Sequence, residues 1–227
     1  MKGKIFVIEG PDGSGKRTQT GLLKDYFASL GRRSKVISFP QYGTKSAGPV
    51  EEYLNGKYGN AANVNPYAAS VLYAVDRFDA SHQIRDLVKN GIIVILDRYI
   101  DSNAAHQGGK IPDLKERDAF LRWLYELEYG VFGIPKPDRT VILHVPAQTG
   151  QTLARKKKKR DYIEGGKKLD GHEANIGHLQ AAENAYLWLA TRDPERYSVI
   201  ECMDGDTLLS KEAIHEKVKA ILMPLVS

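Results

Sequence analysis

Cysteine and long apolar stretches are almost absent from this sequence of 227 residues. A single cysteine, Cys202, leaves no disulfide framework, which favours a reducing compartment such as the cytoplasm. The longest purely aliphatic run, residues 92–96, is far shorter than the ~20 residues that cross a bilayer. Because an apolar run typical of a core strand already starts at Ile5, we expect neither a signal peptide nor a membrane partner.

Positive and negative charges are also nearly balanced in this sequence once one short basic segment is left out. The sequence has 33 basic and 28 acidic residues, and six of the basic ones form the run 155–160. Without that run, 27 basic residues face 28 acidic ones, a net charge of −1. A nucleic-acid-binding surface needs basic residues on several elements, so we expect no nucleic-acid partner.

The basic run itself needs a local explanation. Such a run is usually a solvated face, or a nucleic-acid or targeting patch. Here it begins inside a helical pattern and passes into a loop that contains Gly165 and Gly166. This arrangement favours a mobile lid, at about residues 155–172, that carries arginines to reacting phosphates and excludes water.

Five apolar runs alternate with longer helical patterns along the chain. The runs are nearly continuous rather than alternating, which indicates parallel strands buried on both faces. We therefore predict one α/β domain over residues 1–227, with the three-layer fold of phosphate-loop NTPases: a five-stranded parallel sheet with helices on both faces. The expected strands are Ile5–Glu9, Lys35–Phe39, Ile92–Asp97, Thr140–Val145 and Val199–Cys202. The expected helices are Thr18–Leu30, Pro66–Asn90, Leu114–Tyr129, Gln148–Lys159, His172–Thr191 and Lys211–Leu222.

A glycine-rich stretch, residues 10–18, lies between the first expected strand and the first helix. Glycines there let backbone N–H groups point at a polyphosphate, and Lys16 adds a mobile positive charge. The stretch departs from the pattern G-x-x-x-x-G-K-[ST] at Arg17, where a Mg²⁺-binding hydroxyl normally stands. An ordinary glycine turn is the alternative, but the strand before and the helix after it favour a phosphate-binding loop.

Three further segments carry candidate site residues. Residues 39–43 directly follow the second strand, at the ligand-binding edge of the sheet, although they could form a turn and nothing more. Asp97 and Arg98 lie at the end of the third strand. There the Asp97 carboxylate could bind Mg²⁺, or the two residues could form a salt bridge with each other. The polar stretch 102–108 offers more polar groups than packing requires. Tyr73 and Arg77 share one helix face, either as a cation–π pair or as a base-binding pair.

Taken in order, these motifs resemble the thymidylate kinases. The resemblance covers residues 4–190 and is carried by the phosphate-binding loop with Gln19, Phe39-Pro40, Asp76-Arg77, Asp97-Arg98-Tyr99 with Ser102 and Gln107, Pro135–Asp138, and the basic lid. The forms GKRT and FPQYG are similar to an actinobacterial-type branch, in which arginine also occupies the hydroxyl position. The resemblance implies ATP- and Mg²⁺-dependent transfer of the γ-phosphoryl group to dTMP, giving dTDP, by a homodimer that packs helices such as 66–90 together.

The resemblance also implies a role for each matching position. The ATP phosphates would be held by Gly10, Gly13, Ser14, Gly15, Lys16, Arg17 and Thr18. The dTMP site would comprise Asp12, Phe39, Pro40, Tyr42, Tyr73, Arg77, Arg98, Ser102, Asn103, His106, Gln107, Asp170 and Glu173. The catalytic set would be Lys16, Asp12, Arg98, Arg155 and Arg160, with Mg²⁺ held by Asp12 and Asp97 directly or through water.

Within that set, Tyr73 would stack on thymine where the family usually has phenylalanine, while Arg77 and Asn103 read the base edge. His106 stands where tyrosine is frequent. Two other functions stay open: another nucleoside monophosphate or deoxynucleoside kinase, and a nucleic-acid-binding ATPase module that uses the basic run. An Arg98 that grips a phosphate favours a monophosphate acceptor, and the charge balance argues against the ATPase module.

Overall fold

The computed structural model describes residues 2–155 and 175–226. Its centre is a parallel sheet with the strand order β2-β3-β1-β4-β5, so the predicted five-stranded sheet is confirmed. Each strand lies within two residues of its predicted bounds. The strands are β1 (Ile5–Glu9), β2 (Ser34–Ser38), β3 (Ile93–Asp97), β4 (Arg139–His144) and β5 (Tyr197–Glu201).

Helices connect and cover these strands. The described helices are α1 (Lys16–Ser29), α2 (Gly48–Leu54), α3 (Pro66–Lys89), α4 (Ile100–Gly108), α5 (Leu114–Tyr125), α6 (Ala147–Arg155), α7 (Ile176–Arg192) and α8 (Lys211–Leu222). Two of them, α2 and α4, were not predicted. The helix predicted over 114–129 ends at Tyr125 and continues as a π-helical segment, Glu126–Val131. A short 3₁₀ turn, Met223–Leu225, follows α8.

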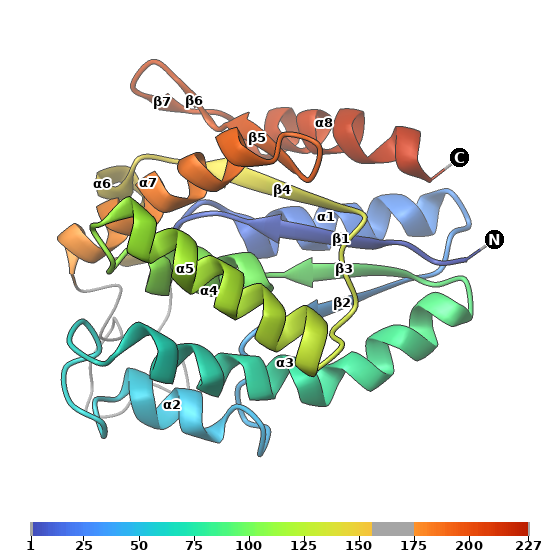
Figure 1. Ribbon diagram of the computed structural model, residues 1–227. Helices are drawn as coiled ribbons and strands as arrows, with labels where there is room; N and C mark the ends of the chain where they lie inside the picture. Colours follow the sequence, from blue (N-terminus) through green and yellow to red (C-terminus); the bar gives the residue numbers. More distant parts are fainter. Residues whose placement is uncertain (1, 156–174, 227) are drawn as a thin grey trace.

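Two short strands, β6 (Met203–Asp204) and β7 (Thr207–Leu208), form an antiparallel hairpin between β5 and α8 that was not expected. The hairpin projects from the sheet in Figure 1. Its turn contains Gly205 with a positive φ of 54°, a conformation that glycine adopts without steric cost.

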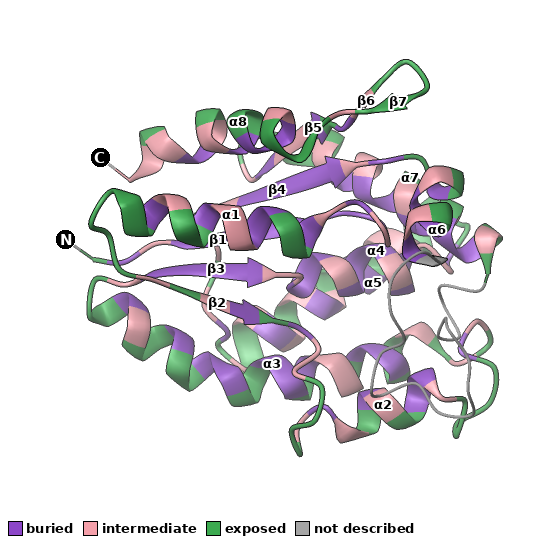
Figure 2. Cartoon of the chain, turned by 180° about the vertical axis from the view of Figure 1, so that it is seen from behind, coloured by how far each residue is buried: buried purple, intermediate pink, exposed green. Residues whose placement is uncertain are grey.

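Apolar helices cover both faces of the sheet, as Figure 1 shows. Successive side chains of a strand point to opposite faces, so each strand serves two cores. One core joins the sheet to α3, α4, α5 and α7 and includes Val7, Leu96, Ile84 and Tyr186. The other joins the sheet to α1 and α8 and includes Phe6, Ile95, Phe27 and Val218. Burial of the inner strands on both sides is visible in Figure 2, where β1, β3 and β4 are almost wholly buried.

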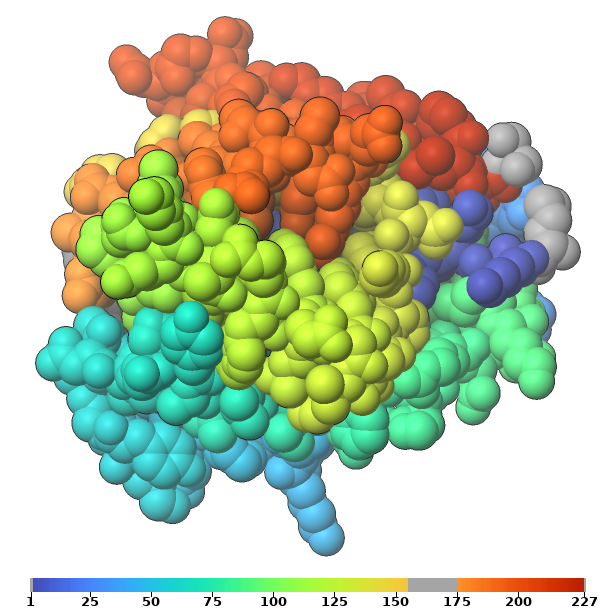
Figure 3. Space-filling view, viewed as in Figure 1, coloured from blue at the N-terminus to red at the C-terminus, as the bar shows by residue number. Residues whose placement is uncertain are grey.

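The layer of helices that carries most of the candidate site is closely packed. In the space-filling view of Figure 3, residues of α5 lie between those of α3 and α7. Helix α3 starts in this layer with Pro66 in its first turn, and the Asn65 side chain accepts a hydrogen bond from the Tyr67 N–H over 2.8 Å.

Among the described residues, no helix has the length and apolarity needed to span a membrane.

Candidate active site

The phosphate-binding loop lies between the end of β1 and the start of α1, as predicted. Gly10, Gly13 and Gly15 have φ values of 138°, 85° and 90°, which side-chain-bearing residues rarely adopt. Lys16 folds back over the loop, and its Nζ donates to the carbonyl oxygens of Gly10 and Pro11 over 2.9 and 2.8 Å. Since α1 begins at Lys16, the positive end of its dipole faces the loop. The loop, Lys16 and the start of α1 therefore have the geometry and the positive charge that suit an anion.

The two residues after Lys16 do not take part in this fold-back. Arg17 and Thr18 are both exposed on the first turn of α1. Ser14, by contrast, is buried in the loop, and its Oγ has no hydrogen-bond partner among the described residues. Buried hydroxyls are normally bonded, so Ser14 is a candidate ligand for a phosphate oxygen.

An ion pair joins the phosphate-binding loop to the end of β3. The Arg98 Nη2 donates to Asp12 Oδ1, and Nη1 donates to Ser102 Oγ over 3.1 Å. Burial alone would lower the pKa of Arg98, but the Asp12 carboxylate outweighs it and holds that pKa well above its ordinary value. The alternative of a salt bridge between Asp97 and Arg98 is not what the structure shows, because Arg98 directs its guanidinium to Asp12.

Arg98 occupies a backbone conformation that is uncommon outside glycine. Its φ is 69°, the one positive φ at a non-glycine position in the described chain. Its N–H donates to the Ile8 carbonyl over 3.1 Å, which ties the turn after β3 to the neighbouring strand β1. Positions of this kind concentrate at functional sites, where the surrounding structure holds them.

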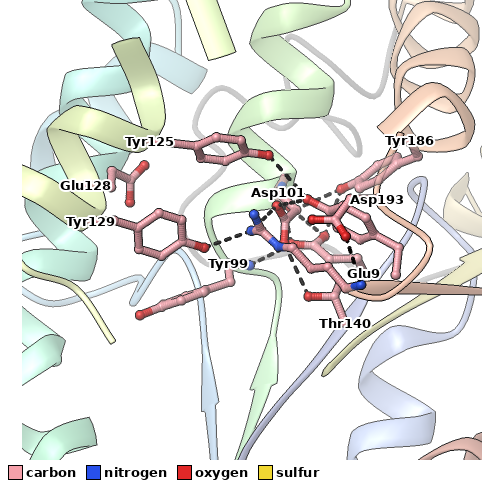
Figure 4. Close-up of polar contacts among 12 residues, drawn as sticks. Glu9, Tyr99, Asp101, Tyr125, Glu128, Tyr129, Thr140, Tyr186 and Asp193 are labelled. Carbon is pink, nitrogen blue, oxygen red and sulfur yellow. Dashed lines mark hydrogen bonds and ion pairs between the residues drawn. The ribbon is translucent and has the colours of Figure 1, made fainter. Parts of the chain in front are cut away.

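A buried carboxylate, Glu9, organises the start of α4. Its Oε1 accepts from the backbone N–H groups of Tyr99 and Ser102 over 2.7 and 3.0 Å, and its Oε2 accepts from the Ser102 and Tyr186 hydroxyls over 2.7 and 2.8 Å. Burial raises the pKa of Glu9, against the opposing effect of the Arg98 charge. The carboxylate thus holds the first turn of α4 at the end of β1, and Figure 4 shows Glu9 among these polar contacts.

Asp101 anchors the same turn from the other side. It accepts from Arg196 Nη2 and from the Tyr197 hydroxyl, each over 2.7 Å (Figure 4). The Arg196 guanidinium also donates to the Tyr129 hydroxyl over 2.7 Å and lies over the rings of Tyr125, Tyr129 and Tyr197. Helix α4 is therefore fixed at its start by two buried carboxylates, which explains how its polar residues can be held toward a ligand.

Two histidines extend the Arg98 network along α4. The Nη1 of Arg98 lies 3.3 Å from His106 Nε2, and His106 Nδ1 lies 3.2 Å from His178 Nε2 on α7. A guanidinium only donates, so Nε2 of His106 accepts and its Nδ1 carries the proton toward His178. His106 is thereby placed beside the Arg98 guanidinium, next to the predicted phosphate site.

The residues predicted to read a base are buried around the first half of α3. Asn103 Nδ2 donates to the Ser70 carbonyl over 3.1 Å, whereas its Oδ1 is buried and without a partner among the described residues. Gln107 Oε1 is buried and unpartnered in the same part of the chain. Tyr73 is half-buried and packs edge to face on Tyr53, with 6.1 Å between ring centroids.

Arg77, which is predicted to read the base edge, is held by a buried partner. Its Nε and Nη2 form a bidentate ion pair with Glu128, and its Nη1 lies 3.5 Å from the Tyr99 carbonyl. The side chain is 2% exposed. Nη1 carries two N–H groups, so one of them remains after the contact with the Tyr99 carbonyl. No local sequence pattern indicates Glu128 as the partner of Arg77, because the two residues are 51 positions apart.

The segment after β2 is held by an acidic residue of α3. Asp76 Oδ2 accepts from the Gln41 N–H over 2.9 Å, and its Oδ1 accepts from Ser46 Oγ over 2.8 Å. Phe39 packs on Tyr99 with 5.7 Å between ring centroids, and the Phe39–Pro40 peptide is cis. The segment is more than a turn: it is fixed to α3 at the edge where the other site residues lie, with Tyr42 exposed beyond it.

Known proteins with similar sequences decide the family. The family model for thymidylate kinase matches residues 8–217. A thymidylate kinase of Mycobacterium tuberculosis is 34% identical over 189 residues, which are 83% of this chain and 86% of the relative. One of Clavibacter sepedonicus is 31% identical over 206 residues, 88% of each chain.

The chain belongs to the thymidylate kinase family. The fold agrees, since a solved thymidylate kinase structure from Candida albicans superimposes with a TM-score of 0.76. That structure is 24% identical and covers 98% of this chain and 92% of its own. The Mycobacterium and Clavibacter relatives agree with the actinobacterial-type resemblance of the loop motifs.

The carboxylates of this thymidylate kinase family member fit Mg²⁺. The ion takes few protein ligands when phosphate oxygens and waters supply the rest. Asp97 is partly exposed at the end of β3, and Asp12 lies in the phosphate-binding loop, paired with Arg98. Arg17 has no lone pair to offer. Among the described residues, no cluster of three or more acidic, histidine or cysteine side chains could hold a metal ion.

Several predicted residues lie outside the described chain. Arg160, Asp170 and Glu173 fall within residues 156–174, together with most of the predicted lid, and the structure describes only the backbone position of Arg155, at the end of α6.

Other site residues were missed. Glu9, Glu128, Tyr186 and His178 come from three separate elements, with Tyr186 and His178 both on α7. Only Glu9 left a signal, as an acid that ends a buried strand directly before the glycine loop.

Proposed function

We propose that this chain transfers the γ-phosphoryl group of ATP to dTMP, giving dTDP and ADP, with Mg²⁺ as the metal. The phosphate-binding loop, with Lys16 and Ser14, would bind ATP, and Arg98 would bind the phosphate of dTMP. When bound, Mg²⁺ would neutralise charge on the transferred phosphate, held by phosphate oxygens with Asp97 and Asp12 directly or through water.

The Asp12–Arg98 ion pair is the observation that carries this proposal. Phosphoryl transfer requires the two phosphates to meet with their negative charges neutralised. Asp12 belongs to the donor-binding loop, and Arg98 ends the strand that supplies the acceptor site, yet their side chains touch. Arg98 is also held by Ser102 and His106, so its guanidinium is preorganised beside the loop.

The base site supports a pyrimidine with a carbonyl at C4. Nη1 of Arg77 can only donate, which suits that carbonyl and opposes the amino group of cytosine. The unpartnered Oδ1 of Asn103 can accept from the N3–H of thymine, which cytosine lacks. Tyr73 would stack on the base, supported from behind by the ring of Tyr53.

We also propose that the chain forms a homodimer through α3. Four apolar residues of this helix are 37–42% exposed and follow a helical spacing, and they are Tyr67, Val71, Val75 and Phe78. Such a stripe on a soluble helix favours a partner surface. The double variant Val71→Glu, Val75→Glu should sediment as a monomer, whereas Leu208→Glu on the β6–β7 hairpin should not change the mass. Equal masses for all three proteins would contradict the α3 interface.

Residues 155–172 would act as the lid of this single domain, with Arg155 and Arg160 on the phosphates and Asp170 and Glu173 lining the nucleotide site. The position of α6, which leads into this segment beside the phosphate-binding loop, supports the proposal. We further propose a cytoplasmic enzyme, in keeping with one free, buried cysteine, Cys202.

Release of ADP tests the proposed reaction. With ATP and Mg²⁺, adding dTMP should raise ADP release strongly, and dTDP should form in equal amount. Arg98→Ala should lower kcat/KM for dTMP by about 10²–10³-fold, because a preorganised charge contact is lost. Arg122→Ala, which removes an exposed arginine of α5, should leave it unchanged. ADP release that does not respond to dTMP would overturn the proposal.

A further inference from the structure

A cluster of three ionisable side chains lies at the carboxyl ends of β4 and β5, apart from the residues assigned above. His144, the last residue of β4, is bonded through both ring nitrogens. Its Nε2 lies 2.9 Å from Glu183 Oε1 on α7, and its Nδ1 lies 2.6 Å from Glu201 Oε2 at the end of β5. Both nitrogens can donate to carboxylates only when the ring is protonated.

The second oxygen of Glu183 holds the start of α6. Its Oε2 accepts from the Ala147 N–H, in the first turn of that helix, over 2.8 Å. A carboxylate in this position satisfies a free helix donor and interacts well with the helix dipole. His144 fixes Glu183, and Glu183 fixes α6, which lies against α7 in Figures 1 and 2.

Helix α6 in turn touches the backbone of the phosphate-binding loop. A Cβ added to Gly150 of α6 would lie 2.3 Å from the Asp12 carbonyl oxygen, and one added to Gly13 would lie 2.1 Å from the Gly150 carbonyl oxygen. Contacts this close leave room for hydrogen only, so a small shift of α6 must move the loop. The chain of contacts runs from His144 through Glu183 and α6 to the residues that would bind ATP.

We propose that His144 and Glu183 are positioning residues that set the shape of the ATP-binding loop by clamping α6 against it. The two carboxylates are unequal partners in this clamp. Glu183 is 17% exposed and accepts a hydrogen bond from α6, whereas Glu201 is 61% exposed and, among the described residues, has no hydrogen bond to that helix. Glu201→Gln is therefore a matched control, because it removes a partner of the same imidazole without touching α6.

Protonation of His144 gives the clamp a pH dependence. Burial lowers the pKa of His144, but hydrogen bonds to Glu183 and Glu201 and their charges outweigh burial and raise it. In the part of the chain that the structure describes, Lys217 of α8 is a further charged group near this cluster, and it donates to the Glu201 carbonyl over 3.1 Å. Because the folded-state pKa is raised, the clamp is complete below the ordinary value and loosens as the pH rises through the raised pKa.

Binding of ATP without an acceptor tests the clamp. We expect Glu183→Ala to raise the ATP Kd about ten-fold, which is the effect of losing one hydrogen bond to a charged group. Glu201→Gln should change the ATP Kd less than two-fold. The dTMP KM should stay within two-fold in both variants. The inference would be overturned if Glu183→Ala and Glu201→Gln raised the ATP Kd equally, or if Glu183→Ala raised the dTMP KM as much as the ATP Kd.

A second variant separates the clamp from a merely structural role. His144→Gln keeps an N–H donor for Glu183 but does not titrate, so it should bind ATP nearly as well as the wild type near pH 7. Between pH 7 and 9 the wild type should lose ATP affinity relative to this variant. The ratio of the two Kd values at each pH removes the effect of the ionisation of ATP itself, which is the same for both proteins. A constant ratio over that range would contradict the clamp.

The inference rests on the proposed ATP site. ATP binding without dTMP reports on the clamp, whereas ADP release with dTMP reports on the proposed reaction, so each can fail while the other holds.

Discussion

Arg77 and Glu128 form a fully buried ion pair in which Nε and Nη2 of the guanidinium each donate to a different carboxylate oxygen over 2.6 Å. Burial would lower the pKa of Arg77, but the charge of Glu128 outweighs it and raises that pKa. Two nitrogens of the guanidinium are thereby committed to Glu128, and Nη1 lies 3.5 Å from the Tyr99 carbonyl. In the base-reading role that we propose for Arg77, Glu128 would set the direction in which Nη1 can donate.

The first prediction concerns this pair. Glu128→Gln leaves a buried guanidinium without its counter-charge, so the free energy of unfolding should fall by about 3–5 kcal/mol. The kcat/KM for dTMP should fall as well, with little change in the ATP KM. Glu126→Gln, on the same π-helical segment but exposed, is the control and should change neither quantity. Urea unfolding and steady-state kinetics measure the two effects, and unchanged stability of Glu128→Gln would contradict the pair's importance.

The second prediction concerns Lys16, which now contacts loop carbonyls and would meet the ATP phosphates. Lys16→Ala should reduce kcat by about 10²–10³-fold, because it removes a charge that stabilises the transition state. Its far-ultraviolet circular dichroism should match the wild type. Lys24→Ala, which removes an exposed lysine of α1, should keep full activity. Near wild-type turnover of Lys16→Ala would remove the basis for the phosphate-loop assignment.

The third prediction concerns Arg17, which stands where a Mg²⁺-binding hydroxyl is usual. It is exposed and cannot ligate a metal, so Mg²⁺ would depend on phosphate oxygens, waters and carboxylates. Arg17→Ser should therefore keep substantial Mg²⁺-dependent activity in a magnesium titration. Loss of turnover in this variant would show that Arg17 has a direct catalytic role.

The fourth prediction uses Lys110, which fastens the segment between α2 and α3. Its Nζ donates to the Tyr53 hydroxyl and the Ala61 carbonyl over 2.9 and 2.6 Å, behind the ring that supports Tyr73. Burial lowers the pKa of Lys110 to about 8. The folded protein therefore releases this proton at lower pH than the unfolded chain, and stability gains from Lys110 as the pH rises from about 8 toward its ordinary value.

Unfolding of wild type and Lys110→Met in urea at pH 7.5, 8.5 and 9.5 measures this gain. The wild type should gain stability relative to the variant over this range, since methionine does not titrate. A stability difference that is independent of pH would mean that Lys110 keeps its ordinary pKa.

The elements that sequence predicted well are those whose pattern is local. Strand β1 was predicted with its observed bounds because five consecutive residues are buried on both faces and a glycine loop follows. Helix α4 was missed because its polar residues, among them Asn103 and Gln107, are buried toward the site rather than toward solvent. This reverses the apolar periodicity by which a helix is recognised.

The candidate site divides in the same way. Motif positions such as Lys16, Arg98 and Asn103 were named as candidates from the sequence, but residues that pair with the candidates across the fold were not, because these come from other elements. Glu128 meets Arg77 across 51 residues, and His144 meets Glu183 across 39 and Glu201 across 57. Pairing across such distances depends on helix packing, for which a single sequence carries no local signal.

We propose that the site phosphorylates dTMP and reads its base through Tyr73, Arg77 and Asn103. A panel of nucleoside monophosphates with ATP and Mg²⁺ tests it most directly, with kcat/KM determined for each. Two mismatched hydrogen bonds should disfavour dCMP by about 10²–10⁴-fold, and loss of the 5-methyl group should disfavour dUMP by roughly 1–3 kcal/mol. We expect kcat/KM to be highest for dTMP and second for dUMP, with dCMP and the purine nucleotides far below. A higher kcat/KM for dCMP or dGMP than for dTMP would contradict it.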